Sequence, residues 1–518
     1  RTRTRTRTRT RTATPSPSPS PSPDPRPLSL GQARSPSPGA MRPLAALALL
    51  ATTAGAPKAP PAWARGGDGW QAWIDAAGAE GLPLRAGEAQ TWDAPVNHSD
   101  PSAGTFQQRW YENTEYYKPG GPVLFEFGGE APVSGPPGGY LATLAQERGA
   151  MLVQVEHRFY GESIPLGNVD TPTLRLLTVN QALADYADFI KWYTADLTER
   201  YPEAKGSFPF FVFGGSYPGA LSAWFMVLYP ELAKGSLSSS GVVDAVYEFT
   251  AFDAHVAGAV GEACADQVRQ STAAFDQALR GGDPEAAAAA KAIWGLGPDF
   301  LDADFFYMLA DGVAMMVQYG AKETLCSELA AFAARDPEPS AEAIMENTRD
   351  IVLQYWGEDF AQGCFYDTAC LRDPKQYVAG ATDRSWRWQK CYELAYLQTA
   401  PASGSLRSDA LDLDALLTQC ESVFGQGYAD PSTEAINDEF GGAKPYTRNV
   451  FYSDFSDDPW MEASFDGKFA SDEQPYDYAV CDGCGHCRDL HAPDASDPQP
   501  VKDLRAAFEK YMDAWLAA

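Results

Sequence analysis

The sequence predicts an α/β fold in which helices cover both faces of a mostly parallel sheet and a helical insertion divides the chain. Continuous apolar runs alternate with helical segments from about residue 120. The alternation stops after about residue 245 and returns with residues 449–460. Unbroken apolar strands separated by helices are typical of parallel sheets that are buried on both sides.

Six apolar runs are the expected strands of this sheet. They are "PVLFEFGGE" (122–130), "AMLVQVEHRFYG" (150–161), the start of "FFVFGGSYPGALSAWF" (210–225), "KGSLSSSG" (234–241), "NVFYSDFSDDPW" (449–460) and "YDYAVCDG" (476–483). Two amphipathic helices are expected beside them, because apolar residues recur at helical spacing over residues 180–200 and 501–516.

The chain divides into five expected segments. Residues 1–40 alternate Arg-Thr and then Ser-Pro, a low-complexity tract that we interpret as absent from the mature protein, with a disordered basic tail as the alternative. Residues 41–64 have the layout of a signal peptide, and their apolar run is shorter than the ~20 residues of a membrane span. Residues 65–245 and 441–518 are expected to form one α/β domain, divided by a helical cap over 246–440.

Charge and cysteine content narrow the class of protein. The net charge is −29, and it is −36 without the eight arginines and one aspartate of residues 1–40. Such an acidic chain does not bind nucleic acid through its general field. All nine cysteines lie between Cys264 and Cys487, which with a signal peptide predicts a disulfide framework and at least one leftover thiol. The sequon at Asn97 predicts a glycosylation site on the same secretory route.

Ser216 lies on a glycine turn between an apolar run and a helical segment. This layout is typical of a nucleophile elbow, in which a sharp strand-to-helix turn exposes a serine hydroxyl above the sheet of an α/β-hydrolase. The G-x-S-x-G pattern is broken, because Pro218 stands where the second glycine is expected and glycine follows only at Gly219. Proline is tolerated in the first turn of a helix, where its missing N–H has no acceptor in any case.

Chain order selects the base and the acid. In an α/β-hydrolase they follow the nucleophile as Asp or Glu and then His, each after a strand. Among five histidines, His486 lies in a glycine-rich loop directly after the last expected strand, and His491 is a weaker candidate. The loop "SDFSDDPW" offers Asp454, Asp457 and Asp458, and Asp458 is favoured because Pro459-Trp460 would stiffen and shield it.

Two backbone N–H groups are expected to stabilise an oxyanion. One belongs to Tyr217, the residue after the nucleophile, and the other to Gly129 in the turn "FGGEAP" after an early strand. A paired glycine after a strand is common, so this second assignment supports the interpretation without deciding it.

Six blocks, in this order, resemble the signature regions of one serine-peptidase family. They are "TFQQRWYENTEYYKPGGPVLFEFGGEAP", "EHRFYGES", "GGSYPGALSAWF", "WRWQKCYELAYLQT", "DDPW" and "GHCRDL", and the resemblance covers roughly residues 90–515. That family contains lysosomal Pro-X carboxypeptidase, dipeptidyl-peptidase II and thymus-specific serine protease. Two departures stand out. Asp454 and Phe455 replace an Asn-Gly pair usual in the family, and Cys481 and Cys484 crowd the histidine loop.

The resemblance implies an α/β-hydrolase domain with an inserted, mainly helical cap and a triad of Ser216, Asp458 and His486. It implies an exopeptidase that cleaves after proline or alanine near a chain terminus, in lysosomes, vacuoles or outside the cell. Trp386 and Trp388 are candidate walls for a proline ring, with packing in the cap core as the alternative. Glu130 is a candidate for binding a substrate amino terminus, or for a structural ion pair.

Rival interpretations remain open at this point. "CDGCGHC" (481–487) resembles half of a zinc site, although an oxidising compartment favours a disulfide, so no metal or other cofactor is expected. A non-catalytic relative acting as a binding protein would have lost a triad member, and none is lost. A serine carboxypeptidase of vacuolar type, or an endopeptidase, would differ in specificity. The expected partners are peptides with proline near a terminus. The sequence predicts no membrane span and leaves a homodimer open.

Overall fold

A computed structural model describes residues 88–374, 383–428 and 430–518. The expected low-complexity tract (1–40), the expected signal peptide (41–64) and the first residues of the expected α/β domain lie outside these described residues. The domain limits drawn from the sequence stay predictions.

Within the described residues, eight strands form one sheet in the order β1-β2-β4-β3-β5-β6-β7-β8. All neighbours from β4 to β8 run parallel, whereas β1 and β2 pair antiparallel with each other and β2 pairs antiparallel with β4. The strands are β1 (Gln90–Pro95), β2 (Thr105–Asn113), β3 (Val123–Phe127), β4 (Met151–Val155), β5 (Phe210–Gly215), β6 (Ser236–Ser239), β7 (Val450–Phe455) and β8 (Tyr476–Ala479).

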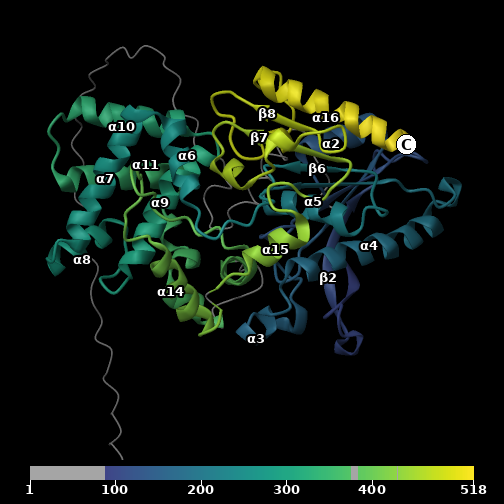
Figure 1. The fold of residues 1–518 in the computed structure, drawn as a ribbon, viewed down its shortest axis with the longest axis horizontal. Coiled ribbons are helices and arrows are strands. Elements are labelled where there is room, and N and C mark those ends of the chain that lie inside the picture. The colour runs from purple at the N-terminus through teal and green to yellow at the C-terminus, as the bar shows by residue number, and fades with distance from the viewer. Residues whose placement is uncertain (1–87, 375–382, 429) are drawn as a thin grey trace, which may run out of the picture. The chain divides into compact units, whose positions relative to one another are not determined.

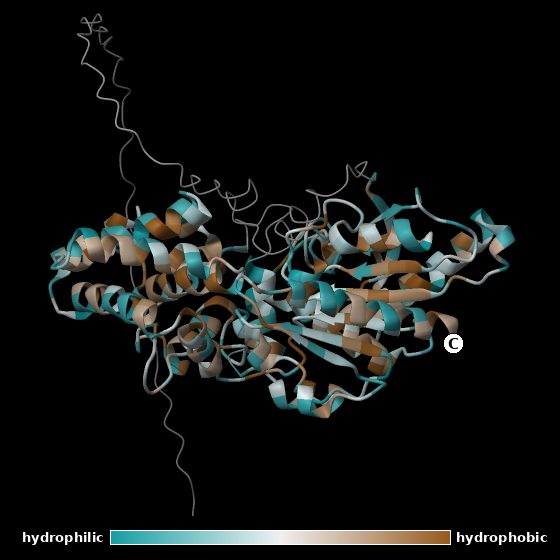
Figure 2. Cartoon of the chain, turned by 90° about the horizontal axis from the view of Figure 1, so that it is seen from above, coloured by the Kyte–Doolittle hydropathy of each residue, from teal (hydrophilic) through white to brown (hydrophobic). Residues whose placement is uncertain are grey.

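Helices cover both faces of this sheet, as Figure 1 shows. On one face α4 (Val179–Arg200) and α5 (Tyr217–Leu228) bury Phe125 of β3 in a large apolar cluster. On the other face α2 (Gly139–Arg148) and α16 (Gln499–Ala517) cover Leu124 of the same strand. Because alternate residues of β3 face opposite sides and both are fully buried, the strand is apolar throughout. Figure 2 shows apolar residues along the strands of the sheet.

The described chain between β6 and β7 consists of helices and loops and contains no strand apart from one isolated bridge between Glu248 and Leu397. Its helices are α6 (Thr250–Val260), α7 (Glu262–Arg280), α8 (Pro284–Ile293), α9 (Asp302–Gln318), α10 (Lys322–Arg335), α11 (Ala341–Trp356), α12 (Thr368–Arg372), α13 (Asp383–Gln389), α14 (Leu413–Phe424) and α15 (Thr433–Phe440). A short α3 (Thr171–Leu174) precedes α4. This helical segment is referred to below as the cap.

All nine cysteines lie among the described residues, and eight of them form disulfides. The pairs are Cys264–Cys326, Cys364–Cys370, Cys391–Cys420 and Cys481–Cys484, and Cys487 is a buried free thiol. The predicted framework and the leftover thiol are thereby present. Since Cys481 and Cys484 bond to each other, the zinc interpretation of this segment loses two of its ligands.

Among the described residues, no helix combines the length and the apolar character needed to cross a bilayer.

Candidate active site

Ser216 stands at a sharp turn between β5 and α5. Its backbone has φ 62° and ψ −128°, a left-handed conformation that costs a non-glycine residue about 1–3 kcal/mol and that surrounding structure must maintain. The Ser216 N–H donates to the Ser239 carbonyl at the end of β6, 2.9 Å away. A fully buried β5 below the turn and a buried α5 after it hold the serine in place. This is the geometry of a nucleophile elbow.

Two glycines make the elbow possible. A Cβ at Gly214 would lie 2.0 Å from the Pro218 carbonyl oxygen, and one at Gly219 would lie 2.8 Å from the Ser239 carbonyl oxygen. Gly219 therefore supplies the close approach of helix to strand that the second glycine of the pattern normally provides. The ring of Pro218 points elsewhere, toward Gly129, where a Cβ would meet the proline Cγ at 2.4 Å. The proline is accommodated by the glycine turn after β3.

This contact leads to a testable prediction about two neighbouring positions. Gly129→Ala is expected to slow labelling of Ser216 by a fluorophosphonate about 10- to 100-fold, because the new methyl group pushes the turn away from the nucleophile. Pro218→Gly alone is expected to stay within about tenfold of wild type, a barrier change of about 1.4 kcal/mol. The double variant should recover most of the loss. Equal losses from Gly129→Ala in both backgrounds would contradict this account.

The expected acid and the expected base are joined by a short hydrogen bond. His486 follows β8, and its Nδ1–H donates to Asp458 Oδ2 at 2.6 Å. Asp458 follows β7, is fully buried, and accepts the Trp460 N–H through Oδ1 at 3.0 Å. Asp458 is therefore fixed by the Pro459-Trp460 turn, as its sequence context indicates. With Nδ1 donating, Nε2 is the basic nitrogen of the ring.

The end of β6 brings the nucleophile and the histidine loop together. The Ser239 carbonyl accepts both the Ser216 N–H and the Cys487 thiol, the latter at 3.4 Å. The Cys487 N–H donates to Ser240 Oγ at 2.9 Å. Strands β5, β6, β7 and β8 are consecutive and parallel, so their carboxyl ends lie at one edge of the sheet. The three predicted catalytic residues follow three of those four strands.

Tyr217, the expected oxyanion donor, is held by a buried chain of hydrogen bonds. Its hydroxyl bonds with His157 Nε2 at 3.1 Å and accepts from Gln389 Nε2 at 2.7 Å. Gln389 Oε1 in turn accepts from the Tyr160 hydroxyl. His157 Nδ1 lies 2.7 Å from the Arg158 carbonyl oxygen, to which it donates, so Nε2 accepts from Tyr217. The Tyr217 N–H itself begins α5 and has no acceptor within the helix.

The other histidines have other partners, although His157 contacts Tyr217 and His255 contacts the Ser456 carbonyl in the loop of the expected acid. Burial lowers the pKa of His157 to about 4, which keeps its ring neutral. His98 contacts Asp185, and His255 contacts Glu462. Burial, followed by the charge of Arg488, holds the pKa of His491 well below its usual range. His486, by contrast, hydrogen-bonds to Asp458, a fully buried carboxylate that follows a sheet strand.

Glu130 lies next to the glycine turn, and its Oε2 atom is buried without a hydrogen-bond partner among the described groups. Burial raises the pKa of Glu130 to about 7. Its charge contributes to the raised pKa of Tyr160, Tyr217 and Tyr319, after their own burial, so the carboxyl group lies near all three rings. No ion pair to Glu130 occurs within the described ranges.

The two tryptophans of α13 differ in their surroundings. Trp386 is partly exposed, and its ring centroid lies 5.7 Å from that of Tyr217. Trp388 is fully buried, stacks on Tyr392 and donates to the Leu177 carbonyl. Trp388 therefore packs in an apolar cluster that the cap shares with residues 159–177, and its assignment as a pocket wall is corrected. An indole with no exposed surface cannot line a binding site.

Asn97, the predicted glycosylation site, follows β1 and is partly buried. Its side-chain oxygen accepts hydrogen bonds from the Ser99 N–H and from Gln181 Nε2, both at 2.9 Å. The modification itself stays a prediction.

Sequence reasoning missed several residues that hold the site. Gln389 anchors Tyr217, and Gln318 at the end of α9 accepts the His486 N–H through its carbonyl at 2.7 Å. Asp489 accepts from the hydroxyls of Ser239 and Ser453, which ties the ends of β6 and β7 together. These contacts join residues far apart in the sequence, so no local sequence motif predicts them.

Comparisons with known proteins agree on one family. The family model described as serine carboxypeptidase S28 matches residues 95–508. The chain is 32% identical to probable serine protease EDA2 of Arabidopsis thaliana, over 82% of this chain and 87% of that protein. It is 29% identical to human thymus-specific serine protease, over 85% of this chain and 88% of that protein. It is 26% identical to mouse lysosomal Pro-X carboxypeptidase, over 80% of this chain and 85% of that protein.

Proposed function

The chain belongs to the serine carboxypeptidase S28 family, and from this premise we propose that it is an exopeptidase that cleaves after proline or alanine near a chain terminus. The family establishes a serine-type peptidase with an α/β-hydrolase fold. The cleavage preference, the catalytic residues and the cellular location belong to the proposal.

The proposed reaction is acyl transfer through Ser216. The Ser216 Oγ attacks the scissile carbonyl carbon while His486 Nε2 takes the hydroxyl proton. Asp458 holds the ring by accepting from Nδ1 and stabilises the imidazolium. The N–H groups of Tyr217 and Gly129 stabilise the oxyanion. His486 returns the proton to the leaving amine, and water then releases the acyl group by the same steps.

One observation supports this proposal most strongly. A fully buried aspartate lies 2.6 Å from the histidine ring, and both residues follow strands parallel to the one that ends at the strained serine. A non-catalytic binding protein, the alternative function, would have no reason to maintain the cost of a left-handed serine at this turn.

The preference for proline rests on a partly exposed aromatic side chain near the residue that follows the nucleophile. The partly exposed ring of Trp386 lies beside the ring of Tyr217, the residue after Ser216. A pyrrolidine ring packs well against aromatic faces. The name of the mouse relative, a Pro-X carboxypeptidase, agrees with this preference.

We assign Glu130 to recognition of a free substrate amino group. Its buried Oε2 has no hydrogen-bond partner among the described groups, and an ammonium group would supply both a donor and a charge. The alternative of a structural ion pair finds no cation on Glu130 within the described residues. Burial raises the pKa of Glu130 to about 7, so the carboxyl group is neutral at acidic pH and charged above neutrality.

Above pH 7, where the Glu130 carboxylate has formed, Glu130→Gln is therefore expected to raise KM about 10- to 100-fold for Lys-Pro or Lys-Ala reporters with a free amino terminus. The amino-blocked substrate Z-Pro-Phe is the matched control and should keep its wild-type KM. For free-amine reporters, the wild-type KM should fall as pH rises through 7, because the carboxylate forms, whereas the Gln variant should show no such fall. Equal effects on both substrate classes would contradict the assignment of Glu130.

The proposed location is the secretory pathway, ending in a lysosome, a vacuole or outside the cell. Four disulfides and the names of relatives, which include an extracellular carboxypeptidase and a lysosomal one, support it. The expected partners are peptide substrates. A homodimer is left open, and size-exclusion chromatography with light scattering decides it.

The experiment that tests the proposed function compares two reporters at pH 5. Wild-type protein should hydrolyse Z-Pro-Phe or a Lys-Pro or Lys-Ala reporter, and a glycine in place of the proline or alanine should reduce kcat/KM. Hydrolysis of neither reporter, together with no fluorophosphonate labelling of Ser216, would contradict the peptidase proposal. Hydrolysis with no preference for proline or alanine would contradict the specificity alone.

A further inference from the structure

A corner of the cap, formed by residues 318–322 between α9 and α10, touches both loops that carry the expected acid and base. The Gln318 carbonyl accepts the His486 N–H at 2.7 Å, and Gln318 Oε1 accepts from Trp460 Nε1 at 2.9 Å. Trp460 itself donates its N–H to Asp458. The same cap residue therefore contacts the histidine and the turn that fixes the aspartate.

The corner and the histidine loop approach so closely that only glycine fits. A Cβ at Gly485 would lie 2.5 Å from the Gln318 carbonyl oxygen and 2.6 Å from the Gly320 nitrogen. Gly320 has φ 77°, and a Cβ there would lie 2.7 Å from the Gly483 carbonyl oxygen. The backbone of the cap is thus in direct contact with the residue before His486.

Asp457, the neighbour of the expected acid, is tied to the histidine loop in two ways. Its N–H donates to the Cys484 carbonyl, and its Oδ2 accepts the Gly483 N–H, both at 2.9 Å. Together with the bond from His486 to Asp458, these contacts close a small ring of hydrogen bonds between the two loops. Movement of one loop must therefore disturb the other.

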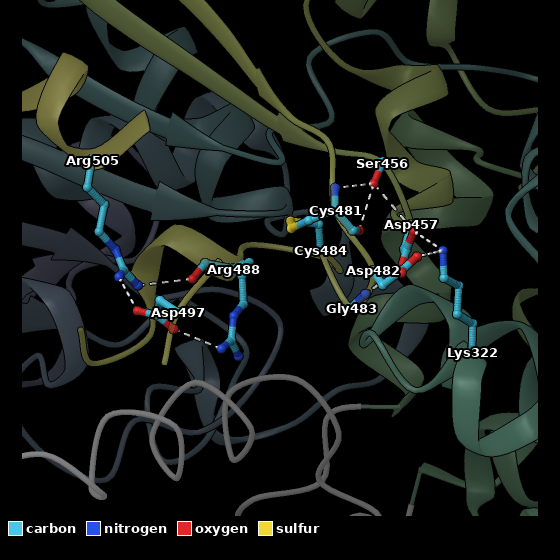
Figure 3. Close-up of a disulfide and its surroundings, with 10 residues drawn as sticks. All are labelled: Lys322, Ser456, Asp457, Cys481, Asp482, Gly483, Cys484, Arg488, Asp497 and Arg505. Atoms are coloured by element: carbon cyan, nitrogen blue, oxygen red, sulfur yellow. Dashed lines mark hydrogen bonds and ion pairs between the residues drawn. A yellow bond between two sulfur atoms is a disulfide. The ribbon is translucent and has the colours of Figure 1, made fainter. Parts of the chain in front are cut away.

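Lys322, the first residue of α10, connects the cap to these two loops. Its Nζ lies 2.9 Å from Asp457 Oδ1 and 3.3 Å from Asp482 Oδ1. The two carboxylates differ in exposure, because the Asp457 side chain is 2% exposed and the Asp482 side chain is 84% exposed. Figure 3 shows Lys322 pointing toward both of them beside the Cys481–Cys484 disulfide.

Loss of the ion pair between Lys322 and the buried Asp457 is expected to cost more than loss of the ion pair between Lys322 and the exposed Asp482. An exposed ion pair is worth about 0–1 kcal/mol, whereas removal of one partner from a buried pair leaves an uncompensated charge. Burial lowers the pKa of the Lys322 ammonium group, but the hydrogen bonds and charges of Asp457 and Asp482 together outweigh it, so the pKa of Lys322 is raised. Lys322 therefore stays charged at the pH values of the assays.

The histidine loop is otherwise stiff. The disulfide closes the four residues from Cys481 to Cys484, and Ser456 Oγ bonds to both the N–H and the carbonyl of Cys481. On the far side Arg488 and Arg505 both pair with Asp497, which anchors the end of the loop to α16, as Figure 3 shows. A stiff loop moves as a unit, so its contact with the cap sets where His486 lies.

We propose that Lys322 is a positioning residue, which couples docking of the cap to the alignment of His486 by holding Asp457 between the acid loop and the histidine loop. This inference rests on the proposed function of His486 and extends it to the cap.

The test compares Lys322→Met with Asp482→Asn, which removes only the exposed arm of the same lysine. Lys322→Met is expected to lower kcat and the rate of Ser216 labelling about 10- to 100-fold, because small misplacements of a catalytic group are costly. KM should stay within about twofold, and Lys322→Arg should restore most of kcat. Asp482→Asn should match wild type within about twofold.

Thermal unfolding of each variant distinguishes a misplaced His486 from a loss of protein stability. If the Met variant does not fold, Lys322→Gln, which keeps one donor, takes its place with the same expectation. A Lys322→Met or Lys322→Gln protein that is folded and as active as Asp482→Asn overturns the inference alone. A wild-type protein that is neither active nor labelled overturns the proposed function, and this inference with it.

Discussion

Ser216→Ala is expected to lower kcat by about 10⁵-fold or more, to a level set by the remaining binding and oxyanion contacts. Alanine keeps the small side chain at the strained turn and its N–H bond to Ser239, so the elbow should persist. What is lost is the only atom that can form the acyl-enzyme. Steady-state hydrolysis of Z-Pro-Phe and of Lys-Pro and Lys-Ala reporters measures the effect.

Ser222→Ala is the matched control, because Ser222 lies six residues further along the same buried helix. Its hydroxyl donates to the carbonyls of Gly219 and Leu237 and therefore has a structural role. We expect kcat within about threefold of wild type. A Ser216→Ala protein that keeps more than about a hundredth of wild-type kcat would show that another nucleophile carries the reaction.

Asp458→Asn is expected to lower kcat by about 10⁴-fold with little change in KM. The carboxylate accepts from His486 Nδ1–H at 2.6 Å, and an amide in its place offers an N–H group that favours the wrong tautomer of the ring. Without an acceptor on Nδ1, Nε2 no longer serves as the base. The pre-steady-state rate of acylation and the rate of fluorophosphonate labelling should fall together.

Asp454→Asn is the control for this second prediction. Asp454 is buried on β7, four residues before Asp458, and burial, with the charge of Asp458 second, raises the pKa of Asp454. The folded chain therefore holds the protonated form, and the stability that this group contributes is lost as pH rises above its unfolded value of about 3.9. The Asn variant should keep kcat and should unfold at a higher temperature than wild type at pH 7, with a smaller difference at pH 4.

Equal losses of kcat from Asp454→Asn and Asp458→Asn would contradict the assignment of the acid. The comparison is strict, because both substitutions replace a buried carboxyl group by an amide of the same shape. Only Asp458 touches the histidine ring.

The central part of the sheet could be predicted from the sequence because its strands are buried on both faces. β3, β4 and β5 have no exposed residue, so an unbroken apolar run marks each one. β1 and β2 were missed, because they alternate exposed and buried residues and carry charged side chains such as Arg109. A one-sided antiparallel pair at the edge of a sheet presents that alternating pattern, which is easily mistaken for a polar loop.

The three triad positions are predicted from strand ends and chain order, and the structure places each of them after a parallel strand. The supports of the triad could not be predicted, because they join the cap to loops that are distant in sequence. Gln389 reaches Tyr217 across 172 positions, and Lys322 reaches Asp457 across 135. Pro218, which breaks the glycine pattern, fits because its ring occupies the place that a Cβ at position 129 would take, and Gly129 has none.

The most direct test of a Ser216–His486–Asp458 peptidase is to map the covalent adduct of a fluorophosphonate by peptide mass spectrometry. The account predicts one adduct, on the peptide that contains Ser216, formed at a rate that falls steeply in Asp458→Asn and is unchanged in Asp454→Asn. An adduct on another residue of an active protein, or active protein that takes up no label, would contradict it.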